Sequence, residues 1–423
     1  MFNTTFPTIL YMLGYVAIFI FLLRKKYDVT ILFIVSIWIV SSIYALVFQS
    51  LMPQYVYNNI TYLPYAFLLL CFGLTLIPVC KGLHLVRDEY CIANIGLYKK
   101  IMLFFIVVSL VPLIENLRYF LTSYGAANTS GLADMYDDKM SMGLQVTWLS
   151  FVGKLGNSLD GIFIQFLMFI PFVFLTQKKI SKWMLICSFL PALNHVIFQM
   201  CASGRTVVTQ FTLIAVFFLF FFRKAIPAPR WRLIRICLIV FFVLFGAALS
   251  VLTSARKEAH NRDNETYEVY GYYLAKSHLD FNHNLWYIKK NTEGDNSFGF
   301  VKSLLGFDVP ENKNDYWTYN KIGVIPSLFY TYIGDWYMDF GPIITLVLFI
   351  FVSIFCTAYF SRKCHNVPII RLFAYYVLCQ IIFMGWSFNC FKTPMGFRNL
   401  LISMMLIIIV QNFSKHARLM YDK

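Results

Sequence analysis

The chain has 423 residues, of which 59% are hydrophobic, 19% are aromatic and 13% are charged, and its formal net charge is +15. Soluble globular chains average about 45–50% apolar and about 25% charged residues, so this chain has too little polar surface to cover its apolar mass in water. The composition excludes a soluble domain, a disordered chain and a disulfide scaffold, and it predicts an all-α polytopic membrane protein.

Eleven apolar stretches approach the length of about 20 residues that a transmembrane helix needs. The apolar stretch Ile322–Tyr332 is shorter, so it could be a re-entrant or interfacial segment. We therefore expect 11 or 12 transmembrane helices. In chain order, the eleven predicted spans are Thr5–Leu23, Ile31–Leu51, Tyr62–Cys80, Ile101–Arg118, Leu155–Thr176, Trp183–Cys201, Thr206–Phe222, Leu233–Thr253, Gly341–Phe360, Ile369–Asn389 and Asn399–Phe413.

The positions of the basic residues predict the direction of the spans. Arg24, Lys25 and Lys26 follow the first span, and together with every second loop thereafter they account for 21 of the 36 Lys and Arg. Because cytoplasmic loops carry an excess of Lys and Arg, we expect the N-terminus outside and the C-terminus in the cytoplasm. The excess positive charge thus indicates topology rather than a nucleic-acid partner.

The predicted spans divide the chain into three parts. Residues 1–253 hold the first eight transmembrane helices, 254–326 form one large extracytoplasmic (periplasmic) loop, and 327–423 carry an outer-surface motif and the last three helices. The ten cysteines show no zinc-ligand spacing, and no phosphate-binding glycine loop occurs, so no metal and no cofactor are expected. Asp160 and His195 lie inside predicted spans, where hydrogen bonding to neighbouring helices is favoured over a proton relay.

Several cations lie on the expected outer side, where the distribution of cytoplasmic charge does not explain them. Arg205 begins a helix after a short turn, so its guanidinium and the free helix N–H groups could bind phosphate oxygens. Alternatively, it reaches lipid headgroups. The other cations follow span eight or separate the last two spans, and they fit a lipid-linked pyrophosphate or a headgroup: Arg256, Lys257, His260, Arg262, Lys392 and Arg398.

Two carboxylates lie among aromatic residues just before the ninth span. Asp335 and Asp339 could polarise a sugar hydroxyl or act as a base in glycosyl transfer, and His260 is a third candidate base. Asp339 could instead cap the helix expected to start at Gly341.

The run from Ile325 to Phe355 resembles the signature of Wzy-type oligosaccharide repeat-unit (O-antigen) polymerases, in which a Pro and a Thr precede Asp-Phe-Gly at the start of a late membrane helix. The Ser203–Arg205 turn resembles the Gly/Ser-Arg segment of that family. The arrangement of many spans, with one large outer loop before the Asp-Phe-Gly helix, is similar as well.

The resemblance implies a glycosyltransferase on the outer face of the bacterial cytoplasmic (inner) membrane. Its partners would be an undecaprenyl-diphosphate-linked oligosaccharide donor and acceptor, with a chain-length regulator as a further partner. The diphosphate leaving group needs charge stabilisation, which the outer cations could supply without a metal. Aromatic side chains could stack on the sugars or equally pack within the protein: Trp286, Tyr287, Trp317, Trp336 and Tyr337.

Other functions stay open at this point. An O-antigen ligase has nearly the same substrate and layout as a polymerase. A lipid-linked oligosaccharide flippase or transporter would favour charges within the spans and short outer loops. A metal-dependent lipid-sugar transferase usually has an acidic pair in its first outer loop, but residues 52–61 contain no acid.

Overall fold

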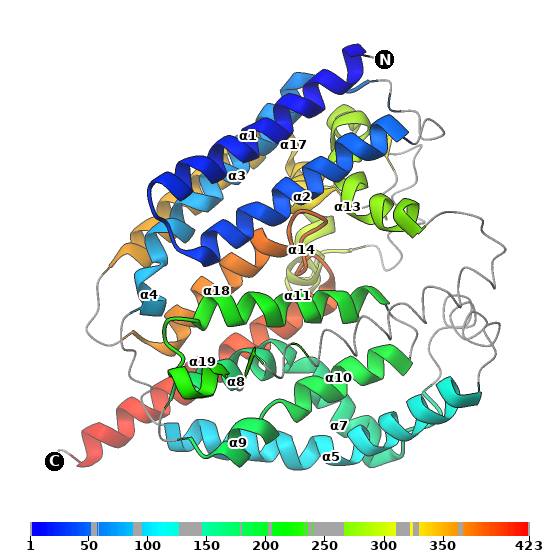
Figure 1. Cartoon of the computed structure of the whole chain (residues 1–423). Helices are drawn as coiled ribbons and strands as arrows, with labels where there is room; N and C mark the ends of the chain where they lie inside the picture. The colour runs from blue at the N-terminus through cyan, green and yellow to red at the C-terminus, as the bar shows by residue number, and fades with distance from the viewer. Residues whose placement is uncertain are drawn as a thin grey trace. The chain divides into compact units, whose positions relative to one another are not determined.

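Helices form the whole regular structure of the residues described. The computed structural model describes residues 2–51, 57, 59–87, 95–126, 146–177, 180–201, 205–232, 234–235, 239, 266–309, 322–324, 330–362 and 367–421. The helices are shown in Figure 1, and in chain order they are α1 (Phe2–Arg24), α2 (Val29–Leu51), α3 (Tyr62–Gly82), α4 (His84–Arg87), α5 (Ile95–Ala126), α7 (Phe151–Ile162), α8 (Ile164–Thr176), α9 (Lys182–Cys187), α10 (Leu190–Cys201), α11 (Arg205–Phe222), α13 (Thr266–His283), the 3₁₀-helix η1 (Leu285–Tyr287), α14 (Asp295–Leu304), α17 (Thr331–Ser361), α18 (Ile369–Met384) and α19 (Pro394–Tyr421).

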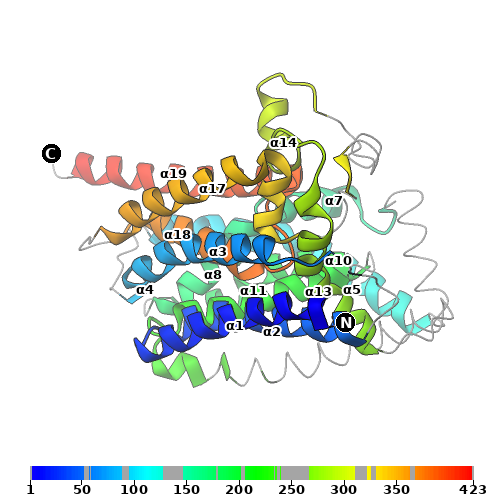
Figure 2. The same cartoon turned by 90° about the horizontal axis from the view of Figure 1, so that it is seen from above.

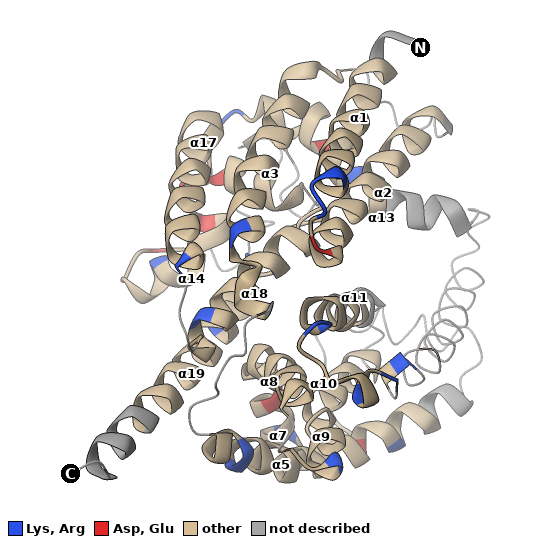
Figure 3. Ribbon diagram, turned by 60° about the vertical axis from the view of Figure 1, so that its left-hand side comes forward, with Lys and Arg blue, Asp and Glu red and all other residues tan. Residues whose placement is uncertain are grey.

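Many of these helices have the length and composition of membrane spans. Among the described residues, seven helices are long and apolar enough to cross a membrane, and an eighth is added if the bent pair α7 and α8 is one span. Figure 3 shows that these helices carry few charged residues along most of their length. The prediction of an all-helical protein with many apolar spans is confirmed. The total of 11 or 12 spans stays a prediction, because Leu233–Thr253 lies almost entirely outside the described residues.

The chain divides into two compact units. Unit 1 contains Met1–Asp88, Glu265–Val367 and Arg371–Arg398, and unit 2 contains Glu89–Asn264, Pro368–Ile370 and Asn399–Lys423. Most of the segment expected as a large outer loop thus belongs to the same unit as the first three spans.

In unit 1, α1, α2 and α3 pack together, α13 lies along α2, and α17 packs mainly against α3 (Figures 1 and 2). A polar side chain of α13 reaches between the spans. The imidazole of His278 lies 2.8 Å from the hydroxyl of Tyr11 and 2.6 Å from that of Ser41. Ser41 lies ten residues before the end of α2, which corresponds to about 15 Å along a helix. α13, which belongs to the expected outer loop, therefore contacts α2 about 15 Å along the helix from the C-terminal end of α2.

In unit 2, α5 packs against α7 and α10, and α8 packs against α11. The predicted span Leu155–Thr176 is divided, because α7 and α8 are bent by 72° at Phe163. The N–H of Phe166, in the first turn of α8, donates to the hydroxyl of Ser403, and the carbonyl of Gly161 accepts from the amide of Asn399. Side chains of α19 thus satisfy main-chain groups that the bend frees.

α17 reverses direction at Gly341. This residue has φ 70° and ψ −177°, a conformation that is essentially restricted to glycine, and Pro342 follows it. The ring of Phe349 lies 5.7 Å from that of Tyr332, although a straight helix would separate these residues by about 25 Å. The hydroxyl of Thr345 also donates to the carbonyl of Trp336 at 3.0 Å. α17 therefore has a short first limb, 331–340, and a long second limb, 342–361, which coincides with the predicted span Gly341–Phe360.

We expect Gly341→Ala to lower the stability of the folded chain by about 1–3 kcal/mol, because an L-residue is strained at this backbone conformation. The Cβ would also lie 3.1 Å from the side-chain nitrogen of Asn291. The measurement is thermal unfolding of the purified protein in detergent. Gly73→Ala in α3 is the matched control, since nothing lies within 4 Å of its Cβ position and alanine favours a helix. Equal melting temperatures for the two variants would show that the reversal does not need glycine.

Candidate functional site

The first limb of α17 begins against an irregular segment, residues 385–393, that joins α18 to α19. The N–H groups of Thr331 and Tyr332 donate to the carbonyls of Ser387 and Gly385, each at 2.9 Å. The indole N–H of Trp38, near the middle of α2, donates to the carbonyl of Ile382. The irregular segment therefore starts deep between the spans. Non-helical backbone at such a depth is tolerated where it is buried in protein or lines a water-filled cavity.

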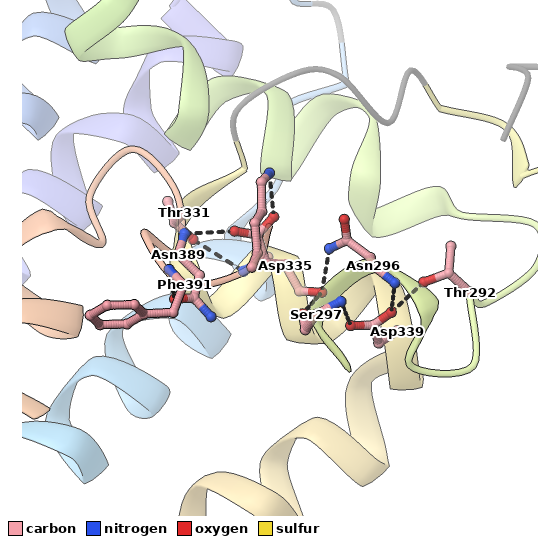
Figure 4. Close-up of polar contacts among 10 residues, drawn as sticks. Thr292, Asn296, Ser297, Thr331, Asp335, Asp339, Asn389 and Phe391 are labelled. Carbon is pink, nitrogen blue, oxygen red and sulfur yellow. Dashed lines mark hydrogen bonds and ion pairs between the residues drawn. The ribbon is translucent and has the colours of Figure 1, made fainter. Parts of the chain in front are cut away.

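Asp335 anchors this irregular segment. Its carboxylate is 0% exposed and accepts from the N–H of Asn389 at 2.7 Å and from the ammonium of Lys392 at 3.0 Å (Figure 4). Lys392 is 16% exposed, and its ammonium lies 5.7 Å from the centre of the Phe388 ring. The buried carboxylate thus orients the ammonium of a partly exposed side chain, and it also binds the turn that carries Lys392 through the N–H of Asn389.

Asp339 holds the start of α14. One carboxylate oxygen accepts from the hydroxyl of Thr292 and from the N–H of Asn296, and the other accepts from the N–H of Ser297 at 2.9 Å (Figure 4). These N–H groups belong to the first turn of α14, where the helix dipole also favours a negative charge. The expectation that Asp339 caps a helix starting at Gly341 is therefore wrong. The helix has already begun at Thr331, so the carboxylate caps a different helix about 40 residues earlier in the chain.

The α14 turn is also joined to the first limb of α17 through the main chain. The amide of Asn296 donates to the carbonyl of Asp335 at 3.2 Å, and the N–H of Thr292 donates to the carbonyl of Met338 at 3.0 Å. Neither carboxyl group reaches the surface, since Asp335 is 0% and Asp339 is 1% exposed. Their geometry is that of positioning residues for Lys392 and α14, rather than of bases in direct contact with a substrate.

An aromatic cluster supports the same limb. The rings of Trp286 and Tyr337 stack with centres 5.2 Å apart, and the hydroxyl of Tyr337 donates to the carbonyl of Trp286. Trp336 packs on Phe298 and Phe349. For Trp286, Trp336 and Tyr337, packing within the protein accounts for the contacts. Tyr287 is 51% exposed and is the one of these aromatics whose ring is largely open to a ligand.

Several predicted site residues lie outside what the structure describes. For Arg205 the structure gives only the main chain, which begins α11 as expected. Arg398 lies near the start of α19, partly exposed and with an interaction partner. The remaining predicted residues fall outside the described ranges: Arg256, Lys257, His260, Arg262 and Trp317.

A second charge pair lies near the C-terminal end of α13, beside Tyr57 in the loop after α2. Lys276 and Asp280 are 3.3 Å apart, and the hydroxyl of Tyr57 donates to Asp280. Burial raises the pKa of Asp280 to about 6, although the positive charge of Lys276 opposes the rise. Because the folded chain binds this proton more readily than the unfolded chain, Asp280 lowers stability as the pH rises from about 4 to about 6.

Sequence reasoning missed the neutral residues of the site. The two buried carboxylates accept hydrogen bonds from four neutral residues, Thr292, Asn296, Ser297 and Asn389. A local signal exists for the second and third, because the run Gly294-Asp-Asn-Ser297 is rich in residues that favour helix N-termini. Asn389 carries no such signal, since its N–H rather than its side chain makes the contact.

Comparisons with known proteins give no relative. No protein-family model, no curated protein and no solved structure matches this chain.

We expect Asp339→Asn to loosen the start of α14, because an amide offers one acceptor oxygen where the carboxylate offers two to the N–H groups of Asn296 and Ser297. The loss of one buried acceptor costs about 1–3 kcal/mol. Hydrogen exchange read by mass spectrometry should show faster exchange in α14, with little change in the second limb of α17. Asp308→Asn, at an exposed carboxylate, is the control, and identical exchange in the two variants would contradict the capping role.

Proposed function

We propose that this chain is a glycosyltransferase that polymerises undecaprenyl-diphosphate-linked oligosaccharide repeat units on the outer face of the bacterial cytoplasmic membrane. The product would be an O-antigen, capsular polysaccharide or exopolysaccharide. The resemblance of the segment from Ile325 to Phe355 to Wzy-type polymerases supports this proposal, and so do the many apolar helices that such a lipid-linked substrate requires of its enzyme.

The observation that carries the proposal is the ammonium of Lys392. Of its three N–H donors, one is directed to Asp335, so the others are available to a ligand from the partly exposed side. A cation held by a buried carboxylate is oriented before the substrate arrives, and this lowers the cost of organising it around a developing negative charge. Lys392 is therefore proposed to bind the diphosphate of the donor. The sequence-based assignment of the same role to Arg205, Arg256, Lys257, Arg262 and Arg398 stays a prediction.

In the proposed reaction, the bond between the anomeric carbon and the diphosphate oxygen breaks, and the diphosphate leaves as an anion on its lipid carrier. A bond forms between that carbon and a hydroxyl oxygen of the acceptor repeat unit. The hydroxyl proton passes to a base, for which His260 is the remaining candidate, because Asp335 and Asp339 are buried. Cations are thus needed at the leaving group, and the glycosyl centre takes on oxocarbenium-like character.

Deletion of the gene tests the biological role. Loss of long surface glycan, with single repeat units still transferred to the final acceptor, supports a polymerase. Complete loss of surface units would indicate a flippase instead. Long chains that accumulate on the lipid carrier would indicate a ligase, and either result would overturn the proposal.

Charge variants then test whether Lys392 acts on the substrate or only on the fold. Lys392→Gln alone leaves the buried carboxylate unpaired, which costs about 3–5 kcal/mol. The double variant Asp335→Asn with Lys392→Gln removes both charges, so we expect it to recover stability and membrane abundance while polymer synthesis stays at least tenfold below wild type. Lys302→Gln, which breaks the ion pair with Asp295 at α14, is the matched control. A double variant with wild-type polymer length would exclude diphosphate binding by Lys392.

A further inference from the structure

Unit 2 contains a carboxyl group that the proposed function does not use. Asp160 lies in the last turn of α7, directly before the 72° bend to α8, and it is 0% exposed. Ionisable side chains inside membrane spans are costly, and they commonly mark functional positions. The helix bend and the buried acid coincide.

The hydrogen bonds around Asp160 determine its protonation state. One carboxyl oxygen accepts from the amide of Asn194 at 2.7 Å, and the other lies 2.7 Å from the hydroxyl oxygen of Ser109. The same hydroxyl oxygen lies 2.6 Å from the carbonyl of Phe105. A serine hydroxyl has one proton, and a carbonyl has none to give. If Ser109 donates to Phe105, the carboxyl group of Asp160 must carry a proton to donate to Ser109. If Ser109 instead donates to Asp160, its single proton is shared between two acceptors.

The charges nearby agree with a neutral acid. Among the described residues, no Lys or Arg lies within ion-pairing distance of Asp160. On α5 and α10, the titratable groups nearest in sequence to the contact residues Ser109 and Asn194 are Glu115 and His195. The carboxylate of Glu115 accepts from the N–H of Ser150. Lys154 of α7 is exposed. A carboxylate at this position would be a buried negative charge without a counter-ion.

We propose that Asp160 is a buried proton-binding site, a carboxylic acid that acts as a hydrogen-bond donor between α7 and α5. Its neighbours form a continuous series of donors. The indole N–H of Trp148 donates to the side chain of Asn116, Asn116 donates to Asn194, and Asn194 donates to Asp160. In the protonated form, the carboxyl group of Asp160 in turn donates to the hydroxyl of Ser109. Loss of the proton forces Ser109 to donate to Asp160 instead of to Phe105, and it leaves an uncompensated charge beside the bend.

Two buried side-chain atoms of α7 and α10 have no hydrogen-bond partner. The Nδ1 of His195 and the side-chain oxygen of Asn157 are buried without a hydrogen-bond partner. His195 follows Asn194 in the chain, and Asn157 lies one turn before Asp160. The Nδ1 edge of His195 faces Gly161, 3.7 Å from the position that a Cβ would take there. The glycine after the acid thus leaves this edge of the imidazole open.

Infrared difference spectroscopy of the full-length protein in detergent tests the proposal at neutral pH. The spectrum of wild type minus Asp160→Asn should contain the carbonyl stretch of a protonated carboxylic acid, with a downshift in D₂O. The control, wild type minus Asp308→Asn, should show carboxylate bands only. Ser109→Ala serves as a second variant, since it should keep the acid band but shift its position because the acid loses its acceptor.

Thermal unfolding shows whether Asp160 binds a proton or a metal cation. Asp160→Asn should keep the melting temperature within about two degrees of wild type, because the amide can still donate and accept, whereas Asp160→Ala should lower it clearly. Exchange of sodium for choline should leave wild type unchanged. Carboxylate bands in the Asp160 difference spectrum, or a sodium-dependent melting temperature that Asp160→Asn abolishes, would overturn the proposal. Neither readout depends on glycosyl transfer.

Discussion

The hydrogen bonds of Asp339 to the first turn of α14 are the interaction on which the arrangement of α14 and α17 in unit 1 depends. A buried carboxylate is stable only when its oxygens are satisfied, and here the donors come from Thr292, Asn296 and Ser297. Two residues later, Gly341 takes a conformation that other residues do not tolerate, and α17 reverses. One short motif thus attaches a neighbouring helix and turns the chain, which brings the first limb of α17 against α3 and against the segment between α18 and α19.

The interior polar groups of both units follow one physical rule. In an apolar protein there is little water to satisfy a buried polar atom, so buried charged and polar side chains favour hydrogen-bonded networks. In unit 1, Asp335 pairs with Lys392, and His278 lies between Tyr11 and Ser41. In unit 2, the described residues place no cation beside Asp160, and neutral side chains bind it. This difference assigns a charged pair to the first unit and a neutral acid to the second.

The proposed polymerase activity gives a chemical meaning to this arrangement. In the proposed transfer from a lipid diphosphate, cations act at the leaving group, and Lys392, which the buried carboxylate of Asp335 holds in place, is proposed as one of them. Under this proposal, Asp335 and Asp339 position a lysine and a helix rather than contact the substrate.

The sequence by itself determined the class of this protein and the position of its first spans, because hydrophobicity over 20 residues is a local property. The predicted Tyr62–Cys80 and the observed Tyr62–Gly82 differ by two residues, and Gly341-Pro342 marks the start of the second limb. Tertiary structure alone decided the partners of Asp335, Asp339 and Asp160, and also the bend at Phe163. The donors of Asp339 lie more than 40 residues away, and the hydrogen-bond partners of Asp160 lie 34 and 51 residues away. Such pairings arise from helix packing over long sequence separations, so no spacing within one segment can reveal them.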